Sequence, residues 1–427
     1  MKKLHIFTSA ACNYIPKVRM LFRSLREHHP EAVLHLALAD ERTSLLNLEK
    51  EPFDEVMTVA DLEIPEWRPW AFCHSIVELA TAIKPFCLKK LLEREDCGQV
   101  LYLDPDMVVF SRLDDIVTSL QEANLVLTPH QTEPEATLSA IMDNEICSLK
   151  HGVYNLGFVG VANTPEGYRF AAWWASRVYH FCRSEIHNGL FTDQRWIDLV
   201  PAFFDGVAIS RSPRHNVATW NLTTRTLSRS ENGQYLVDGE PLGFYHFTGF
   251  DSGAHRIMAN RNAAGNDAVE NLVNWYDDSI FDLARDPLSQ VPWAYGAYSD
   301  GSAITRVHRF IYRERVDLQR AYPDPFVVSA HDGFLGWASR QGPKEYPALF
   351  DNKTSDTTMM EMSRNLTPGF RLHLEIEQGS SGGVKSLLRQ SLRNPALGVV
   401  LAKRAIGILR REGYGGIKRR LEQSKLI

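Results

Sequence analysis

With 427 residues, the chain is long enough for one large domain or two ordinary ones, with a substantial buried core. It is 44% hydrophobic and 23% charged, as is usual for globular proteins. The net charge of −5 gives no electrostatic reason to expect nucleic acid as a partner, and no stretch approaches the length of a transmembrane helix. The six cysteines form no Cys-x-x-Cys pair and no zinc spacing, so we expect reduced thiols in a cytoplasmic protein.

Strand and helix patterns alternate over the first 130 residues. Apolar, β-branched runs predict strands at 4–8, 33–38, 56–59, 100–103 and 125–127. Apolar residues at helical spacing predict helices at 17–29 and 75–92, with a kink at the Lys84–Pro85 step. Further on, a strand is expected at 154–162 and helices at 168–182 and 269–283. This order is typical of an α/β fold with a mostly parallel central sheet and helices on both faces.

Two carboxylates follow one of these strands directly. In the run Gln99–Phe110, the apolar stretch ends at Asp104 and Asp106, and a second apolar stretch begins at once. Ligands of open α/β sheets bind at such strand ends. Two carboxylates this close repel each other unless a cation lies between them, and hard divalent ions prefer oxygen ligands. An acidic surface turn is the alternative, but the strand context favours a metal site.

Five other segments place a polar group in an apolar setting. They carry Lys84 (in Glu78–Phe86), Asn155 (in Tyr154–Gly160), Asp193 with Gln194 (in Phe191–Ile197), Asn221 (in His215–Leu222) and His246 (in Phe244–Phe250). Each has a purely structural alternative. His246 could be a hydrogen-bonded histidine of the core, and Asp193 could be the N-cap of a helix. Asn221 could be a turn residue, and Lys84 could form an ion pair with Glu78.

In their order along the chain, these segments resemble the glycosyltransferases of the GT-A fold, in particular family 8 and related bacterial enzymes of polysaccharide assembly. The resemblance rests on the strand-end Asp-x-Asp, an Asn-x-Gly strand, an Asp-Gln helix start, a Trp-Asn loop and a His-x-x-Gly segment. It covers about residues 3–340. The opening Ile6-Phe-Thr-Ser9 with Asn13-Tyr14 is also similar to the nucleotide-binding first strand and loop of that group.

The resemblance implies a role for each matching residue. Asp104, Asp106 and His246 would bind Mn²⁺, or Mg²⁺ in its place, at the diphosphate of a nucleotide sugar. Asp193 and Gln194 would be the catalytic pair at the donor sugar, with Gln194 near the anomeric carbon. The implied donor-binding residues are Thr8, Ser9, Asn13, Lys84, Tyr102, Asp104, Asn155, Asn221 and Gly249. Asn155 and Asn221 would hold sugar or acceptor hydroxyls.

Two positions depart from the family pattern. Family 8 commonly follows His-x-x-Gly with Lys-Pro-Trp, whose lysine touches the diphosphate, whereas this chain has Phe250-Asp251-Ser252. Arg195 follows the Asp-Gln pair in place of a third polar acid. Both departures bear on the identity of the donor and on retention of the anomeric configuration.

These features together predict a metal-dependent glycosyltransferase of hexosyltransferase type. It would move a sugar from a nucleotide-sugar donor to a glycan or lipid-linked glycan acceptor, with retention, in bacterial surface polysaccharide synthesis. A nucleotidyltransferase is one alternative, but it is expected to carry a Gly-rich phosphate loop that residues 8–13 lack. A non-catalytic glycan-binding or scaffold protein of the same fold is another, and the intact Asp104, Asp106 and His246 set argues against it.

Three parts are expected along the chain. Residues 1–251 form the GT-A catalytic domain, 252–340 its C-terminal part with acceptor-side elements, and 341–427 a linker and a basic amphipathic tail. From Lys385 to Ile427 there are eleven basic and two acidic residues, interleaved with aliphatic ones. This pattern fits peripheral contact with the anionic surface of the inner membrane. It fits a solvated helix packed on its own domain equally well, and the sequence leaves both open.

Overall fold

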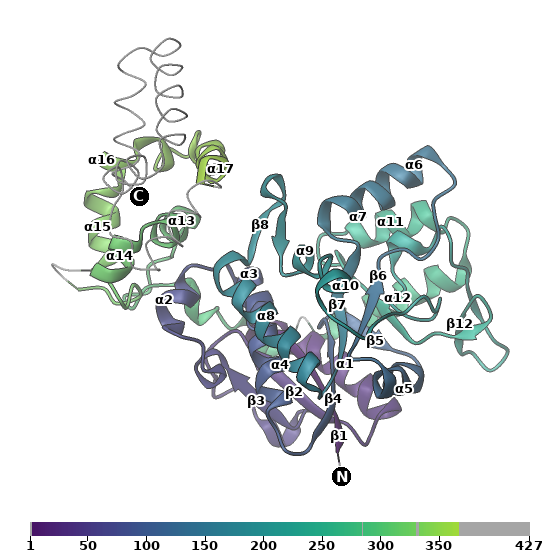
Figure 1. The fold of residues 1–427 in the computed structure, drawn as a ribbon. Coiled ribbons are helices and arrows are strands. Elements are labelled where there is room, and N and C mark those ends of the chain that lie inside the picture. Colours follow the sequence, from purple (N-terminus) through teal and green to yellow (C-terminus); the bar gives the residue numbers. More distant parts are fainter. Residues whose placement is uncertain (1, 284, 330–332, 367–427) are drawn as a thin grey trace, which may run out of the picture. The chain divides into compact units, whose positions relative to one another are not determined.

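The structure is a computed structural model that describes residues 2–283, 285–329 and 333–366 (Figure 1). The predicted linker at 379–383 and the basic tail Lys385–Ile427 lie outside these residues. These described residues divide into two compact units, the first within 2–309 and 321–337 and the second within 310–320 and 338–366. The sheet and the sites discussed below belong to the first unit.

The first unit is built on a seven-stranded sheet with the order β10-β6-β7-β4-β1-β2-β3. Its strands are β1 (Lys3–Ala10), β2 (Val33–Leu38), β3 (Glu55–Thr58), β4 (Cys97–Leu103), β6 (Leu125–Pro129), β7 (Tyr154–Ala162) and β10 (Val207–Ile209). β7 runs antiparallel to its neighbours β4 and β6, and the remaining pairs are parallel. The strands at 33–38 and 154–162 have the predicted bounds, and the others differ by a few residues.

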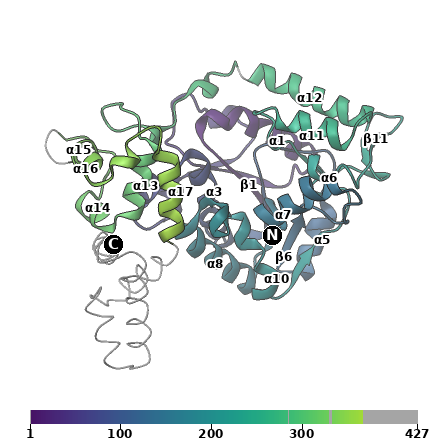
Figure 2. The ribbon, with the colours of Figure 1, turned by 90° about the horizontal axis from the view of Figure 1, so that it is seen from above.

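Helices cover both faces of this sheet. The bounds of the helices nearest to it are α1 (Ile15–His28), α4 (Lys84–Leu92), α5 (Asp114–Glu122) and α8 (Pro165–Phe181). α1 and α5 share one apolar core with alternate strand residues such as Ile6, Leu101 and Leu103. α4 and α8 pack against each other, and Figure 2 shows α8 and α1 on opposite sides of β1. The predicted α/β class, with a mostly parallel sheet between helical layers, is confirmed.

The helix predicted at 75–92 is two helices, α3 (Ile76–Ala82) and α4, which meet at Ile83. Ser75 and Glu78 form a capping box at the start of α3, and Pro85 lies in the first turn of α4. A proline at this position cannot donate the hydrogen bond that would continue α3, so a new helix begins there.

Several shorter elements complete the edge of the sheet at which its parallel strands end. They are β5 (Met107–Val109), α6 (Leu138–Ala140), α7 (Ile146–His151), β8 (Arg183–Glu185), β9 (Leu190–Thr192), α9 (Gln194–Ile197), the 3-10 helix η6 (Thr219–Asn221) and β14 (Phe244–His246). β14 pairs with β5 in antiparallel register, with His246 opposite Met107. His246 is thereby placed beside Asp106, which immediately precedes β5.

The remaining elements lie further from this edge or follow it in the chain. They are α2 (Trp67–Phe72), α10 (Val200–Phe203), β11 (Leu227–Arg229), β12 (Tyr235–Val237), β13 (Glu240–Pro241), α11 (Ala254–Asn262), α12 (Asp267–Leu283), α13 (Arg306–Glu314), α14 (Val316–Ala321), α15 (Phe334–Arg340), α16 (Gly342–Glu345) and α17 (Ser355–Leu366). Among the described helices, none combines the length and the apolar character that a membrane span requires.

Candidate active site

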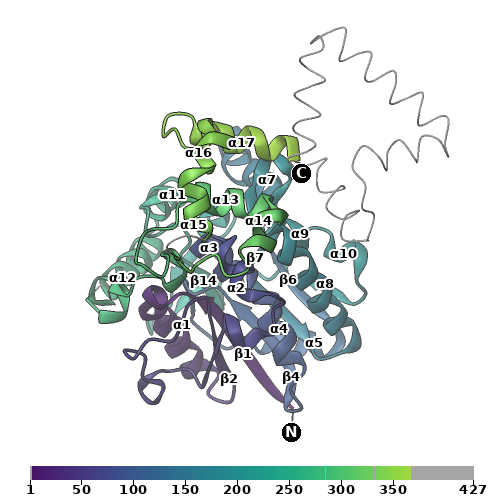
Figure 3. The same ribbon diagram turned by 90° about the vertical axis from the view of Figure 1, so that its left-hand side faces the viewer.

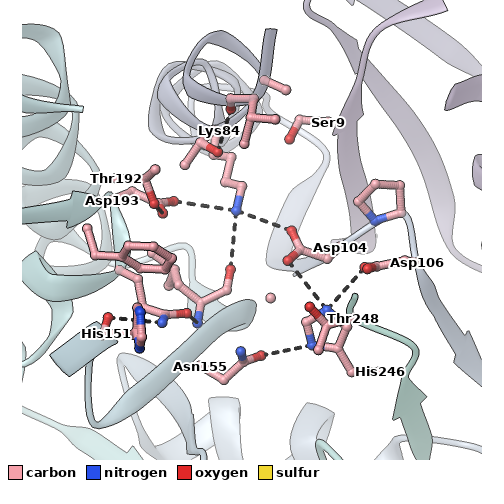
Figure 4. A pocket seen from close by; sticks show the side chains of 18 of the residues that line it. Ser9, Lys84, Asp104, Asp106, His151, Asn155, Thr192, Asp193, His246 and Thr248 are labelled. Carbon is pink, nitrogen blue, oxygen red and sulfur yellow. Dashed lines mark hydrogen bonds and ion pairs between the residues drawn. The ribbon is translucent and has the colours of Figure 1, made fainter. Parts of the chain in front are cut away.

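Asp104, Asp106 and His246 meet at the carboxyl end of β4. Nε2 of His246 lies 3.1 Å from Oδ1 of Asp106 and 3.8 Å from Oδ2 of Asp104. One ligand atom from each of the three residues falls within 4.8 Å of the others (Figure 4). The sequence segments that were predicted to form a metal site are therefore adjacent in space, and the role of these residues as ligands stays a prediction.

A chain of hydrogen bonds orients the His246 ring. Its Nδ1 lies 3.3 Å from Oδ1 of Asn155, and Nδ2 of Asn155 lies 3.2 Å from Nε2 of His130. Nδ1 of His130 in turn lies 3.3 Å from the carbonyl oxygen of Val153. Since the carbonyl oxygens only accept, Nδ1 of each ring carries a proton, and Nε2 of His246 is the ring atom that faces the two carboxylates.

This donor set fits a hard divalent cation such as Mn²⁺ or Mg²⁺. Two carboxylates and one imidazole, with the imidazole fixed in the correct tautomer, are typical of such sites. Burial opposes a charge on His246, but Asp106 outweighs it and raises the pKa of His246 above its ordinary value. Burial also opposes ionisation of Asp106, yet His246 lowers the pKa of that carboxyl. The two groups thus favour an ion pair of imidazolium and carboxylate, and a cation can take the place of the proton on Nε2 of His246.

Gly157 permits the close approach of His246 to β7. A Cβ at this position would lie 2.7 Å from Cε1 of His246, 2.7 Å from Oδ1 of Asn155 and 2.6 Å from the terminal methyl of Met107. The amide of Asp104 also donates to the carbonyl of Gly157 at 2.8 Å. The space that a side chain would fill at Gly157 is thus taken up by the imidazole.

Lys84 is the buried cation beside the carboxylates. Its Nζ lies 3.2 Å from Oδ1 of Asp104 and 3.5 Å from Oδ2 of Asp193, and it donates to the carbonyl of Leu156 at 3.4 Å. The hydroxyl of Tyr102 donates to the same oxygen of Asp104. Burial opposes the ammonium charge, but Asp104 and Asp193 outweigh it and hold the pKa of Lys84 well above its ordinary value. These pairs replace the structural alternative of a pair with Glu78.

Asp193 lies at a strained turn between β9 and α9. Thr192 has a φ of 48°, a left-handed conformation that is costly for a β-branched residue. Asp193 is 2% exposed, and burial raises its pKa to about 6 against the opposing charge of Lys84. As the N-cap residue of α9 it makes no side-chain capping bond. Its carboxylate instead faces Lys84 (Figure 4).

Both ends of the Gln194 side chain are bonded to the backbone. Its Nε2 donates to the carbonyl of His151 at 3.1 Å, and its Oε1 accepts from the amide of Leu156 at 3.0 Å. Gln194 therefore joins the end of α7 to the start of β7. It borders the pocket, but its amide is already engaged at both polar ends.

These residues surround a pocket of about 720 Å³. The predicted site residues that line it are Ser9, Asn13, Lys84, Tyr102, Asp104, Asp106, Asn155, Asp193, Gln194 and His246. Three predicted donor-binding residues, Thr8, Asn221 and Gly249, are not among its lining residues. Thr8 is fully buried within β1.

Asn221 is corrected to a structural role. Its side chain is fully buried, donates to the carbonyls of His130 and Asn216, and accepts from the amide of Ala218. Because it is fully buried and does not line the pocket, it cannot reach a sugar hydroxyl there. It instead fixes the turn that presents Trp220, whose ring lies edge-on to His246 with centroids 5.4 Å apart. Gly249 has a φ of 70°, so it allows a left-handed backbone turn directly after Thr248. Thr248 does line the pocket.

Other pocket residues were missed from the sequence. His130, His151, Trp220, Thr248 and Asp251 all contribute to the wall, beside Tyr14 of the predicted nucleotide-binding loop. The Tyr14 hydroxyl donates to Asp251 at 3.3 Å, and Lys17 forms an ion pair with the same carboxylate. Asp251 follows the His-x-x-Gly segment, so the departure from the family pattern was the signal that this position faces the pocket.

The fold and the site define an α/β protein with a candidate cation centre and a pocket where the parallel strands of its sheet end. This is the arrangement that the resemblance to GT-A glycosyltransferases implies. No family model matches the chain. Two curated relatives are the uncharacterized proteins YfnD and YfnF of Bacillus subtilis strain 168. YfnD is 28% identical over 255 residues (58% of this chain and 79% of YfnD), and YfnF is 26% identical over 257 residues (57% and 82%).

Among solved structures, the chain is similar to the galactosyltransferase LgtC in complex with donor and acceptor sugar analogs, with 18% identity and a TM-score of 0.38. That alignment covers 64% of this chain and 95% of LgtC. It is also similar to the glycosyltransferase GlyE of Streptococcus pneumoniae TIGR4, with 14% identity and a TM-score of 0.38, over 66% of this chain and 64% of GlyE. Likeness at this level carries no argument about the reaction, and the fold described above rests on the strand order of this chain.

Proposed function

We propose that the protein is a metal-dependent glycosyltransferase that moves a sugar from a nucleotide-sugar donor to a glycan or lipid-linked glycan acceptor. The observation that supports this best is the Asp104, Asp106 and His246 cluster, open to the pocket and backed by the buried Lys84. Sheets of this kind bind their ligands at the carboxyl ends of their strands. The resemblance in sequence supplies the nucleotide sugar as the expected ligand.

Each residue of the site has a part in this proposal. Asp104, Asp106 and His246 would hold Mn²⁺ or Mg²⁺, which when bound would offset the negative charge of the departing diphosphate. Asn155 holds a proton on Nδ1 of His246, which leaves Nε2 as the ring atom that would bind the ion. Lys84 contributes a fixed positive charge, since its two carboxylate partners keep it protonated. Asp193 and Gln194 remain the proposed catalytic pair, with Gln194 also holding the backbone at the pocket wall.

We retain three finer proposals from the sequence. The transferred sugar is a hexose, the anomeric configuration is retained, and the product belongs to a bacterial surface polysaccharide. We also propose that the protein is cytoplasmic and that its basic tail, Lys385–Ile427, binds the anionic cytoplasmic face of the inner membrane, near a lipid-linked acceptor. Proton NMR of the product linkage distinguishes retention from inversion.

The test is release of nucleoside diphosphate by the full-length chain from UDP-glucose, UDP-galactose and GDP-mannose, with Mn²⁺, with Mg²⁺ or with EDTA. We expect at least one donor to be turned over with Mn²⁺ and not with EDTA. Asp106→Asn should lower turnover at least a hundredfold, because it removes one charged ligand. Asp114→Asn is the matched control, since this exposed aspartate lies on α5 outside the pocket.

The assay also separates the alternatives. A nucleotidyltransferase releases pyrophosphate from a nucleoside triphosphate instead, and a scaffold protein turns over none of the donors. Equal rates for Asp106→Asn and the unmodified protein would show that the cluster is not the reaction centre.

A further inference from the structure

Three aromatic rings from distant parts of the chain meet on the first unit, outside the active-site pocket. Phe110 follows β5, Tyr235 lies on β12 and Trp275 on α12. The ring of Phe110 makes edge contacts with both others, at centroid distances of 5.6 Å to Tyr235 and 5.7 Å to Trp275. Trp275 is 41% exposed, whereas the other eight tryptophans of the chain are buried or half-buried. Aromatic rings grouped at the surface in this way are common in binding sites.

Phe110 and Tyr235 pack against the hydrophobic core that contains α12, the helix that carries Trp275. The amide of Phe110 donates to the carbonyl of Gly243 at 2.8 Å. α12 buries Leu272, Val273 and Tyr276 on its other side. The guanidinium of Arg229 lies 5.1 Å from the centre of the Tyr235 ring and donates to the carbonyl of Gly233 at 3.0 Å. β11 packs against α12, which Figures 1 and 2 place beside the β11–β12 hairpin.

Two hollows adjoin these rings, and Phe110, Tyr235 and Trp275 line both. The first has a volume of about 600 Å³ and lies between α1 and α12, which pack side by side in Figure 3. The second has a volume of about 540 Å³. Both volumes are in the range of small-molecule sites.

Polar side chains with free hydrogen-bonding groups surround the rings. Arg23, Glu27 and Gln234 border the first hollow, and Asn271 and Asp278 border the second. Within the described part of the chain, none of these five side chains makes a hydrogen bond or an ion pair. The charged groups have both signs, so the surroundings select neither an anion nor a cation.

We propose that the two hollows form a second carbohydrate-binding site, for neutral pyranose residues of a glycan chain. The apolar face of a pyranose packs on an aromatic ring, while its hydroxyls bond to amides, carboxylates and guanidinium groups. The strand β5 begins next to Asp106 and ends next to Phe110, about 13 Å away at 3.3 Å per residue. The site therefore holds a part of the glycan that does not react. Holding an unreacting part of the glycan during transfer rests on the proposed function, whereas the binding of a glycan to the two hollows does not.

The experiment is native affinity electrophoresis of the full-length chain in gels containing galactomannan, mixed-linkage β-glucan or dextran. We expect at least one of these neutral polysaccharides to retard the protein. Trp275→Ala should weaken that binding at least tenfold, and Asn271→Ala severalfold. The matched control is Phe281→Ala, since Phe281 is also an exposed aromatic residue of α12 (64%) but lines neither hollow. Thermal unfolding of each variant shows whether it is folded. If Trp275→Ala does not fold, Asn271→Ala, on an exposed helix surface, still tests the proposal.

The outcomes are distinct. Retardation that persists in Asp106→Ala and fails in Trp275→Ala supports the second site, even if the transfer assay shows no turnover and the proposed function falls. Retardation that fails in Asp106→Ala but persists in Trp275→Ala places the glycan in the active-site pocket and overturns the proposal. An unmodified protein that none of the three polysaccharides retards also overturns it, and leaves protein docking as the use of this surface.

Discussion

Gly157 lies where β7 passes under the imidazole of His246. A methyl group at this position would come within 2.7 Å of Cε1 of His246. We therefore predict that Gly157→Ala displaces the ring and weakens Mn²⁺ binding by about 10–100-fold, the range for lost orientation of a metal ligand. Titration calorimetry with MnCl₂ measures the effect.

Gly296→Ala is the control for this substitution. Its Cβ would meet nothing closer than 3.5 Å, and its φ is not in the left-handed region. Unchanged Mn²⁺ affinity in Gly157→Ala would mean that His246 is not a ligand.

Lys84 stabilises two carboxylates at once, the buried one of Asp193 and the half-buried one of Asp104. Replacing it by methionine preserves much of its volume but leaves Asp104 and Asp193 without their cation. Removal of one partner from a buried ion pair costs about 3–5 kcal/mol, so the free energy of unfolding of Lys84→Met should fall by that order. Urea denaturation at pH 7 measures the change.

The double variant Lys84→Met/Asp193→Asn tests the cause of this loss. Asparagine removes the charge that methionine leaves unpaired, so the double variant should recover a large part of the stability. If it is no more stable than Lys84→Met, the loss comes from packing and not from the ion pairs.

The identity of the site residues was easier to predict than their partners. Asp104, Asp106 and His246 carry chemistry that is rare within apolar segments, and their spacing matched a known pattern. The amides of Asn155, Asn221 and Gln194 did not allow the same inference. An amide bonds to backbone and to sugar hydroxyls equally well, and its partner depends on loops whose positions a sequence does not give.

At the scale of secondary structure, the capping box of α3 supports one wall of the pocket. Oγ of Ser75 accepts the amide of Glu78 at 3.3 Å, and the Glu78 carboxylate accepts the amide of Ser75 at 2.9 Å. The helix that begins here contributes Ile76, Val77 and Ala80 to that wall.

We predict that Ser75→Ala lowers the free energy of unfolding by about 1 kcal/mol, as the loss of an N-cap does, while Ser75→Asp restores most of it. Chemical denaturation measures both. Ser176→Ala in the exposed middle of α8 is the control, and a loss of equal size there would exclude capping as the cause.

The strands were predicted well because burial on both faces makes each a short, continuous apolar run. For the helix at 75–92, Pro85 predicted a kink, but the sequence does not show whether a helix bends at a proline or ends and begins again there. The group of Phe110, Tyr235 and Trp275 could not be predicted, because it depends on the packing of three elements that are far apart in the chain.

At the scale of the whole molecule, three buried histidines and the half-buried His308 are kept neutral. Burial lowers the pKa of His35 to about 3 and the pKa values of His130, His255 and His308 to about 4. Their ordinary value in the unfolded chain is 6.5, so between pH 6.5 and 4 the unfolded state binds more protons than the folded state. Stability is then lost as the pH falls through this window. His246, whose pKa is raised, acts in the opposite direction.

We therefore predict a steep fall in the free energy of unfolding from pH 7 to pH 5. Each neutral histidine contributes up to about 1.4 kcal/mol per pH unit. Urea denaturation at pH 7, 6 and 5 measures the slope, and His35→Gln should make it shallower. A stability that is constant over this range would contradict the buried, neutral state of these rings.

The pairing of β14 with β5 also sets the time at which the cation site forms. His246 lies 140 positions after Asp106, so the ligand set exists only after that long loop has closed and most of the first unit has been synthesised. A divalent ion bound by these three residues would therefore not nucleate folding of this chain. It would bind the finished fold, and we expect it to slow unfolding and to leave the rate of folding unchanged.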